Sequence, residues 1–576
     1  MSKGKRSVLI ALLSLGAMPV AAAEFRLSGV EKPLADNIRA VLSLDDALER
    51  KPLPRPGRLR YLHRQAEEEI RTALQPFGYY SPELELQLNV EGDSAGWYAD
   101  YKINPGPRTL LGKINVQLLG EGQDDPELLK VISDSRLKQG QPFLHQHYAA
   151  LKSTLQSHAS ERGYYDAAYR AASVRVDVAA STADVDLIYD TGRRARIGAI
   201  HFDEAPVSEQ LLRRYLPFTE GDPVSTGSLV QLQRNLIDSN YFADVEVRPR
   251  LEQRDEGIVP VDIGLTPRKQ TLYQGGVGYG TDTGARMQIG MTRRWLNESG
   301  HSLDARLRLS ETTQSFTTSY LIPGDNPVTD RFALNLRFED ENTDVIDSRT
   351  LGIGGSWQKQ LGEWERRIAL DWEQEQWTFE GEERESMLLL PSIKFSRTRA
   401  DDRLNTRKGH SISLGVAAAA EPLLSDTSLV QFDLRGKRVD SLSDRWRLLT
   451  RAELGLTLVD SVDDLPASLR FFAGGDNSVR GYDYQTLGPR GDDGDVIGGR
   501  YLVASSVEVD YLVRDKWRVA AFVDAGNAFD DNNMNLKTGA GIGARWQSPV
   551  GPIRLDLAVP LEETGVRIHF TLGPDL

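Results

Sequence analysis

Apolar and polar residues follow two different periods in the two parts of this 576-residue chain. Between residues 24 and 268, stretches with apolar residues at helical spacing, such as the one around Leu229 and Leu232, alternate with short extended runs. After Pro267 the helical period disappears, and apolar residues occupy every second position of successive segments up to the end of the chain. The pattern therefore predicts an α+β part followed by an all-β part.

The α+β part contains three repeats of one pattern. In each repeat an aromatic pair follows the helical stretch and precedes two extended runs; the three examples are Gly78-Tyr79-Tyr80, Gly163-Tyr164-Tyr165 and Asn240-Tyr241-Phe242. They recur at intervals of roughly 80 residues, a normal size for a small domain. Each repeat is predicted to form a strand, two helices and two further strands, in domains over residues 24–104, 105–191 and 192–268. From the residues alone, three generic α/β domains of unknown use remain an open alternative.

The all-β part, residues 269–576, divides into about sixteen alternating segments, roughly 19 residues for each strand and its loop. A soluble sandwich would also carry an apolar residue at every second position. Here the opposite face carries charge in strand after strand, as the water-filled interior of a membrane barrel would. The pattern predicts a sixteen-stranded antiparallel transmembrane β-barrel, and the even number of strands returns both ends of the barrel to the same side.

The first 23 residues have the pattern of a signal peptide. Three basic residues precede the short apolar run Val8–Ala17, and Ala21-Ala22-Ala23 offers a cleavage site. No other uninterrupted apolar run has spanning length and the mean hydropathy is −0.40, so an exported protein with this sequence is either soluble or a barrel. The net charge of −14 argues against nucleic acid as a partner, and the lack of cysteine excludes a disulfide framework.

The longest loop of the all-β part, about residues 459–499, contains Val479-Arg480-Gly481-Tyr482. A loop of this length can fold back into the lumen, where the Arg480 guanidinium needs carboxylate partners. Glu508 and Asp524 lie on the next two strands, each on the face opposite the lipid-facing apolar residues. From the residues alone, a solvated arginine in a mobile loop remains the alternative.

The first and last barrel strands predict a weak junction. Four glycines interrupt the first strand, Gly275, Gly276, Gly278 and Gly280. The last strand, 566–572, is short and ends at Gly573 and a proline; its lipid-facing residues include Ile568, Phe570 and Leu572. A junction with few hydrogen bonds favours a lateral gate at which a client strand can pair. The alternative is an ordinary closure of the barrel.

Two motifs indicate a family. Val479-Arg480-Gly481-Tyr482 resembles the V-R-G-[FY] signature of outer-membrane assembly and translocation proteins, and Phe522-Val523-Asp524-Ala525-Gly526 resembles their partner motif F-x-D-x-G. The three repeats resemble POTRA domains, and residues 24–576 are similar to the TamA family, the outer-membrane subunits of translocation and assembly modules. The resemblance implies that the Arg480 loop is pinned inside the barrel wall at Asp524 and Glu508.

The same resemblance implies an outer-membrane assembly factor with its POTRA domains in the periplasm. It would insert or translocate autotransporters and other β-barrel clients by strand pairing at the lateral gate. Its implied partners are a TamB-like periplasm-spanning protein, unfolded clients and outer-membrane lipid, without a cofactor. A two-partner-secretion pore that exports unfolded substrate through the lumen is the main alternative, and a passive porin is the second.

Enzymatic activity is not expected. Gly539-Ala540-Gly541-Ile542-Gly543 lacks the following helix that a phosphate site needs, and is interpreted as a stripe of small residues in a barrel strand. The eight histidines are scattered along the sequence, and no serine, histidine and aspartate converge as a catalytic set.

Overall fold

The computed structural model describes residues 24–50, 52–91, 96–379, 381–403, 405–492, 494–531, 534–548 and 551–572. The predicted signal peptide, residues 1–23, and the predicted gate residue Gly573 lie outside the described residues. The chain forms two compact units, and the boundary between them runs through the third small domain. Among the described residues, no helix is both long and apolar enough to cross a membrane.

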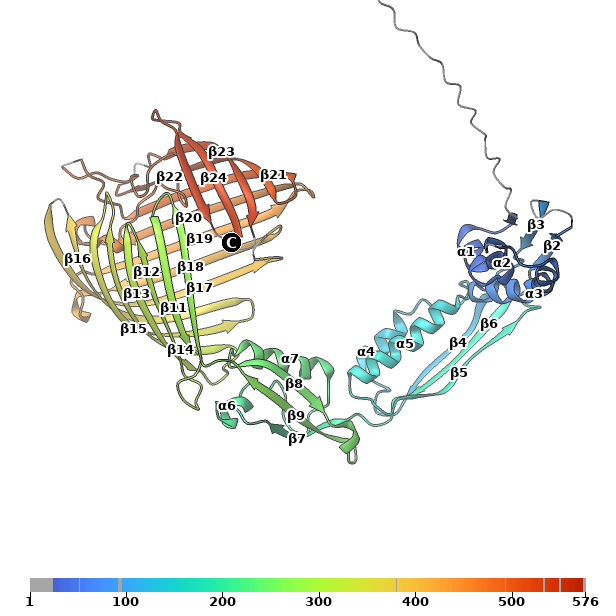
Figure 1. Ribbon diagram of the computed structural model, residues 1–576. Helices are drawn as coiled ribbons and strands as arrows, with labels where there is room; N and C mark the ends of the chain where they lie inside the picture. The colour runs from blue at the N-terminus through green and yellow to red at the C-terminus, as the bar shows by residue number, and fades with distance from the viewer. Residues whose placement is uncertain are drawn as a thin grey trace, which may run out of the picture. The chain divides into compact units, whose positions relative to one another are not determined.

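Three small mixed domains come first (Figure 1). The first contains β1 (Glu24–Ser28), α1 (Lys32–Val41), α2 (Ser43–Glu49), α3 (Pro56–Leu74), β2 (Glu83–Asn89) and β3 (Tyr98–Asn104). The second contains β4 (Leu110–Leu119), α4 (Pro126–Ser133), α5 (His145–Glu161), β5 (Ala168–Asp177) and β6 (Thr182–Asp190). The third contains β7 (Arg196–Phe202), α6 (Glu209–Arg213), α7 (Thr226–Asp238), β8 (Phe242–Pro249) and β9 (Ile258–Pro267).

Each domain has the same three-stranded sheet, in which the last strand lies in the middle: β1-β3-β2, β4-β6-β5 and β7-β9-β8. The predicted order of strand, helices, strand and strand is confirmed. The first domain has one more helix than expected, because Leu42 is extended (φ −77°, ψ 104°) and divides the helical stretch into α1 and α2.

Helical spacing explains the cores of these domains. In α3, Leu59, Leu62, Ala66 and Ile70 recur on one face and are buried. They belong to one apolar cluster with the middle strand β3, whose Tyr101 is fully buried. Each helix layer therefore covers one face of its sheet, and β2, β5 and β8 remain edge strands of their sheets.

The first and third aromatic pairs of the repeat lie where one domain meets the next element. Tyr80 and His145, which begins α5 of the second domain, form a hydrogen bond of 2.7 Å between Oη and Nε2. Tyr241 of the third domain donates from Oη to the backbone oxygen of Gly300 at 2.6 Å. An aromatic residue of the first pair and one of the third pair thus contact the element that follows their domain.

Sixteen strands follow, each antiparallel to the next, which confirms the predicted sixteen-stranded barrel sheet. They are β10 (Thr271–Gly280), β11 (Gly284–Arg293), β12 (Ser302–Ser310), β13 (Thr313–Pro323), β14 (Asp330–Asn342), β15 (Asp347–Leu361), β16 (Trp364–Phe379), β17 (Glu382–Ala400), β18 (Gly409–Ala419), β19 (Leu429–Ser441), β20 (Trp446–Leu458), β21 (Tyr501–Arg514), β22 (Trp517–Phe529), β23 (Lys537–Ser548), β24 (Gly551–Pro560) and β25 (Arg567–Leu572).

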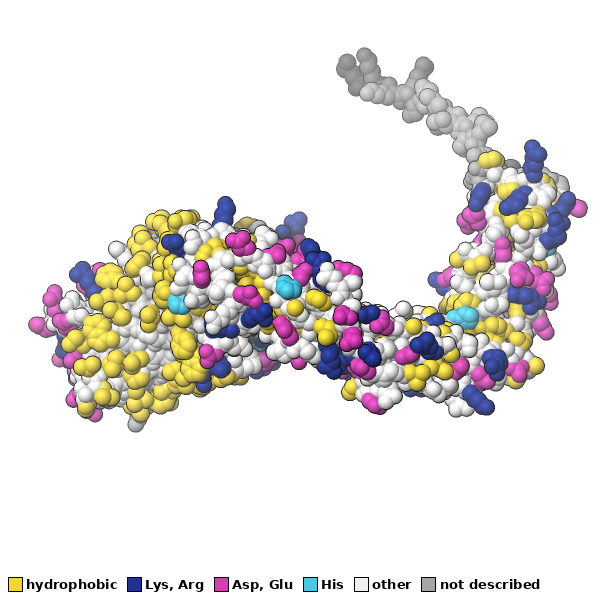
Figure 2. Space-filling view, turned by 90° about the horizontal axis from the view of Figure 1, so that it is seen from below, with side chains coloured by type: hydrophobic (Ala, Val, Ile, Leu, Met, Phe, Trp, Pro, Cys, Tyr) yellow, Lys and Arg dark blue, Asp and Glu magenta, His cyan; other side chains and the backbone are white. Residues whose placement is uncertain are grey.

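Alternation places the two classes of side chain on opposite faces of the barrel wall. In β22, Val519 and Val523 are exposed on the outside, whereas Phe522 and Asp524 are buried on the inside. Figure 2 shows apolar side chains gathered over the barrel surface. Such a surface suits contact with lipid, and the inner face is left for polar groups.

Candidate functional site

The loop between β20 and β21 packs onto the inner face of the barrel wall. Its residues Val479, Tyr482 and Leu487 are buried together with Leu502 of β21 and Ala528 of β22. Gly481 has a φ of +100°, a conformation that glycine adopts without strain. The apolar contacts and this turn carry the neighbouring Arg480 to the wall.

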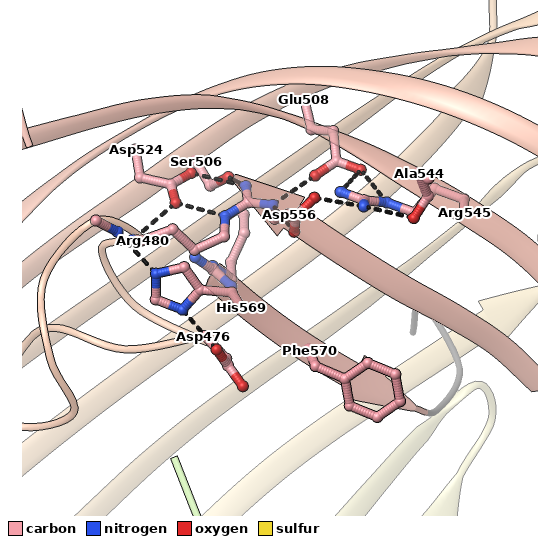
Figure 3. A network of polar contacts seen from close by, with 12 residues as sticks. Asp476, Arg480, Ser506, Glu508, Asp524, Ala544, Arg545, Asp556, His569 and Phe570 are labelled. Atoms are coloured by element: carbon pink, nitrogen blue, oxygen red, sulfur yellow. Dashed lines mark hydrogen bonds and ion pairs between the residues drawn. The ribbon is translucent and has the colours of Figure 1, made fainter. Parts of the chain in front are cut away.

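Arg480 contacts both carboxylates proposed from the sequence (Figure 3). Its Nε and Nη2 donate to the two oxygens of Asp524, at 2.7 and 2.9 Å. Its Nη1 donates to Glu508 at 2.8 Å, and its backbone N–H donates to Asp524 at 3.0 Å. The guanidinium carbon lies 3.4 Å from the ring centroid of Phe522. The side chain is therefore fixed by a two-point carboxylate contact and by an aromatic face.

Two further charged residues complete this network, Asp556 of β24 and Arg545 of β23. Asp556 accepts from Nη1 of Arg480 at 3.0 Å. Arg545 donates to Glu508 at 2.9 Å and also to Asp556. We call Arg480, Glu508, Asp524, Arg545 and Asp556 the loop anchor. All five are less than 10% exposed, so two buried arginines face three buried carboxylates.

Electrostatics holds Arg480 in its charged form. Burial alone would lower the pKa of Arg480. The hydrogen bonds and charge of Asp524, followed by the charges of Glu508 and Asp556, outweigh burial and raise that pKa above its usual value. A buried ion network of this kind tolerates the loss of a partner poorly, because the remaining charge stays in a region of low polarity.

Glycine makes the close approach of the loop to β23 feasible. A Cβ atom added at Gly539 would lie 1.8 Å from the backbone oxygen of Arg480. A Cβ added at Gly541 would lie 2.5 Å from the ring of Phe522. Gly539 therefore leaves room for the loop backbone, and Gly541 leaves room for the Phe522 ring that packs against Arg480.

The barrel sheet has two ends, β10 and β25. Within the described residues, β10 pairs with β11 and β25 pairs with β24, and no strand ladder joins β10 to β25. Gly275, Gly276, Gly278 and Gly280 lie in β10, whereas Ile568, Phe570 and Leu572 lie in β25. Nothing lies within 4 Å of a Cβ added at Gly275 or Gly276. The predicted gate residues that are described thus lie on the two edges of one seam.

Side chains, not a ladder, connect the two edges at the end of β10. The hydroxyl of Thr281, in the turn after β10, accepts from the backbone N–H of Phe570 at 3.1 Å. The same hydroxyl donates to the carboxylate of Asp476 at 2.9 Å. Asp476 belongs to the loop between β20 and β21, which we call the lumen loop. Asp282 accepts from the backbone N–H of Asp476 at 2.8 Å. The turn after β10, the loop and the last strand are therefore held together at one point.

His569 of β25 belongs to the same connection. Its Nδ1 lies 2.6 Å from Oδ1 of Asp476, and its Nε2 accepts from the backbone N–H of Gly481 at 2.9 Å. Because Nε2 accepts, the hydrogen-bond pattern assigns the ring proton to Nδ1, which donates to Asp476. We call Thr281, Asp282, Asp476 and His569 the seam clasp.

Ligand atoms of Asp282, Asp476 and His569 lie within 4.8 Å of one another, which is the spacing of a metal site. Metal binding would need a lone pair on one histidine nitrogen. Nε2 already accepts a hydrogen bond and Nδ1 carries the proton, so hydrogen bonding satisfies the ring in this arrangement. The donor set does not fit a metal.

Six of the nine residues of the loop anchor and the seam clasp were not predicted from the sequence. Arg545, Asp556 and His569 occupy lumen-facing positions that strand alternation indicates, but alternation does not tell which of them meet. Thr281, Asp282 and Asp476 lie in a turn and a loop, where no periodic signal exists.

Two family models and several known proteins match this chain. Residues 283–575 match the family model of the Omp85 superfamily domain, and residues 24–105 match that of POTRA domain TamA domain 1. The outer membrane protein assembly factor BamA of Nitratidesulfovibrio vulgaris is 23% identical over 499 residues, which cover 82% of this chain and 62% of that protein. BamA of Neisseria meningitidis serogroup B is 23% identical over 587 residues, covering 88% and 72%.

A solved structure is also similar, that of BamA from Haemophilus ducreyi lacking POTRA domains 1–3. It aligns with a TM-score of 0.68 and 20% identity, and covers 80% of this chain and 99% of that one. At this identity the likeness concerns the fold. The chain spans about three fifths of the length of the BamA from Nitratidesulfovibrio vulgaris that it matches.

Proposed function

This chain belongs to the Omp85 superfamily of outer-membrane β-barrels, and we propose that it assembles other β-barrel proteins by pairing their strands with β10 at the seam. The proposal concerns insertion or translocation of clients, autotransporters among them. It requires no catalytic step and no cofactor, because strand pairing and burial of the client in lipid supply the free energy.

The observation that carries the proposal is the way in which the seam is joined. In a barrel, every backbone N–H and C=O that faces lipid without a partner costs several kcal/mol, so strand edges are normally paired all round. Between β10 and β25 the described residues contribute a side-chain connection at one end. Opening this seam breaks few backbone hydrogen bonds, and an incoming strand gains a row of them along β10.

The lumen loop contributes residues to both the seam clasp and the loop anchor, so its position can control whether the β10–β25 seam opens. Asp476 belongs to the seam clasp, and Arg480, four residues later, belongs to the loop anchor. The anchor fixes the loop on β21 to β24, and the clasp connects the loop with both edges. We infer that displacement of the loop and opening of the seam are coupled.

The small domains supply the periplasmic part of the proposal. Residues 24–105 match a TamA-type first POTRA domain, which supports membership of a translocation and assembly module and a TamB-like partner. The domain limits 24–104, 105–191 and 192–268 are proposed as three POTRA domains that receive clients. Their edge strands β2, β5 and β8 are suited to an extended client segment.

A covalent lock of the seam tests the function. Tyr279 and Phe570 lie on opposite edges with ring centroids 6.4 Å apart, and the native chain has no cysteine to interfere. In the variant Tyr279→Cys/Phe570→Cys, a short bifunctional thiol reagent joins the edges. Insertion of an autotransporter barrel, synthesised in vitro, into proteoliposomes should then be lost and should return when a cleavable reagent is cut.

A matched control joins two strands that already pair. Leu555 of β24 lies opposite Phe570 in the native ladder, so Leu555→Cys/Phe570→Cys should leave insertion unchanged after the same treatment. Full insertion through the locked β10–β25 seam would contradict the proposal.

Export of unfolded protein through the lumen is the competing function. It would require the loop to leave the buried charges of the anchor before any substrate could pass. Single-channel recording distinguishes the two: a large, steady conductance would favour an export pore or a porin, whereas a small, fluctuating conductance agrees with assembly at the seam.

A further inference from the structure

The free edge of the barrel sheet is β10, and the guanidinium of Arg286 lies on its lumen-facing side. Arg286 of β11 lies directly opposite Gly278 of β10, and Gln288 lies opposite Gly276. A Cβ added at Gly278 would lie 2.8 Å from Nε and 3.4 Å from Cγ of Arg286. The arginine side chain therefore extends across β10, and the missing side chain at Gly278 is what gives it room.

Arg286 lines a cavity of about 940 Å³ beside the seam, which Gly276, Gly278 and Leu572 also line. A second arginine in the lining, Arg308 of β12, donates to the amide oxygen of Gln288 at 3.3 Å. Glu339 is the carboxylate of the lining, so positive charge is in excess.

Two other arginines of the inner wall, unlike Arg286, form ion pairs with carboxylates. Arg306 of β12 pairs with Asp304 at 3.1 Å, and Arg337 of β14 pairs with Glu373 at 2.9 Å. Among the ion pairs formed within the described ranges, none includes Arg286. Arg308 is in none of them either, but it lies one strand further from the edge, so within the described ranges Arg286 is the arginine next to the edge that has a charge to offer to an incoming group.

We propose that Arg286 is a specificity-determining residue, which selects client strands that carry a carboxylate on the lumen-facing side next to Gly278. This inference rests on the proposed function, because it assumes that the client strand pairs with β10. Adjacent strands lie about 4.8 Å apart, so a lumen-facing side chain opposite Gly278 meets no β10 side chain and is within reach of Arg286. Opposite charges at such cross-strand positions stabilise pairing.

The chemistry of the site favours a strand over a lipid. A phosphate headgroup would also attract Arg286, but it leaves the backbone N–H and C=O groups along β10 without partners. A peptide strand satisfies both the backbone of β10 and the guanidinium. The glycines at 275, 276 and 278 keep the edge flat for such pairing.

Strand capture in the full-length protein tests the inference. Val277 is 89% exposed on the outer face of β10, so Val277→Cys provides a single thiol at the edge. Two synthetic peptides of alternating polarity carry a cysteine that pairs opposite position 277. They differ only in the next, lumen-facing residue, which is Asp in one and Asn in the other. The readout is the disulfide yield in zwitterionic detergent micelles over a range of peptide concentrations.

The Asp peptide should be captured at about fivefold lower concentration than the Asn peptide. Arg286→Ala should remove this preference without changing capture of the Asn peptide, and Arg286→Glu should transfer the preference to a Lys peptide. Arg306→Ala is the matched control, because Arg306 also faces the lumen but is paired with Asp304, and it should keep the preference.

Three results would overturn the inference. Equal capture of the Asp and Asn peptides would refute the role of Arg286 while leaving pairing at β10 intact. Capture of neither peptide would refute this inference together with the proposed function. If vesicles of a lipid with an anionic phosphate headgroup abolish the preference of the wild-type arginine, the site belongs to lipid and not to a client carboxylate.

Discussion

The carboxylate of Asp476 lies 2.6 Å from Nδ1 of His569, which connects the lumen loop with the last strand of the barrel. Both side chains are 5% exposed. The other ring nitrogen, Nε2, accepts a hydrogen bond from the backbone N–H of Gly481, the residue after Arg480 of the loop anchor. One histidine thus contacts the loop at two points, on either side of the turn that carries Arg480 to the wall.

His569→Ala should loosen the loop and the seam together. It removes the acceptor for the buried N–H of Gly481 and the donor for Asp476, and an unpaired buried group costs about 1–3 kcal/mol. We expect the folded, fast-migrating gel band to disappear at a lower temperature and the loop to become sensitive to protease. Thr571→Ala, a substitution on the same lumen-facing side of β25, should change neither; equal effects of both variants would contradict a specific role of His569.

Arg480→Ala should destabilise the barrel by about 3–5 kcal/mol, because Asp524, which is fully buried, loses its charge partner. Arg480→Lys keeps the charge but not the two-point contact, so an intermediate loss is expected. The measurement is the denaturant midpoint of the gel-migration change. Arg490→Ala, on the exposed part of the same loop, is the control, and an Arg480→Ala barrel as stable as this control would refute the anchor.

Gly539→Ala should detach the loop from β23 although it adds only a methyl group. The new Cβ would lie 1.8 Å from the backbone oxygen of Arg480, so one of the two segments must move. Protease cleavage within residues 476–487 should become faster, and insertion of clients should fall. Gly436→Ala in β19 adds the same methyl group where nothing lies within 4 Å, and should behave as the wild type.

The seam clasp should strengthen as the pH falls below neutral. Burial, and secondly the charge of Asp476, raise the pKa of Asp282 to about 6. When the clasp opens, this pKa returns toward the usual value of about 4, so the clasped state binds the proton more tightly. The clasp therefore gains stability between about pH 6 and pH 4 and has the least above pH 6. The gel-migration temperature should show this trend in the wild type and lose it in Asp282→Asn.

The positions of the strands and the side of the wall that each residue faces were predictable from the sequence. Both depend on the alternation of apolar and polar residues within one short segment. Alternation gave sixteen strands and placed Glu508 and Asp524 on the inner face, where both contact Arg480. The glycines of the first strand indicated the position of the seam for the same local reason: glycine weakens strand pairing wherever it occurs.

Contacts across the lumen were not predictable. Asp556 is 76 positions from Arg480, and Asp476 is 194 positions from Asp282, so each pair meets only after the sheet has curved into a barrel. Strand alternation indicates that Arg545 and Asp556 point inward. Which arginine contacts which carboxylate depends on the curvature of the barrel wall. The helical stretch of the first domain likewise gave no sign of its division at Leu42, which the backbone conformation of one residue determines.

The Thr281 hydroxyl has one proton, and it serves two neighbours at once: it gives that proton to Asp476 and receives the amide proton of Phe570. Whatever withdraws Asp476 leaves this hydroxyl free to rotate, so Phe570 loses its fixed acceptor in the same event. The link between β10 and β25 at this point is accordingly lost together with the contact to the loop. If clients pair with β10 as proposed, this shared hydroxyl makes exposure of the strand edge depend on movement of the loop, which limits the time during which an unpaired edge can aggregate.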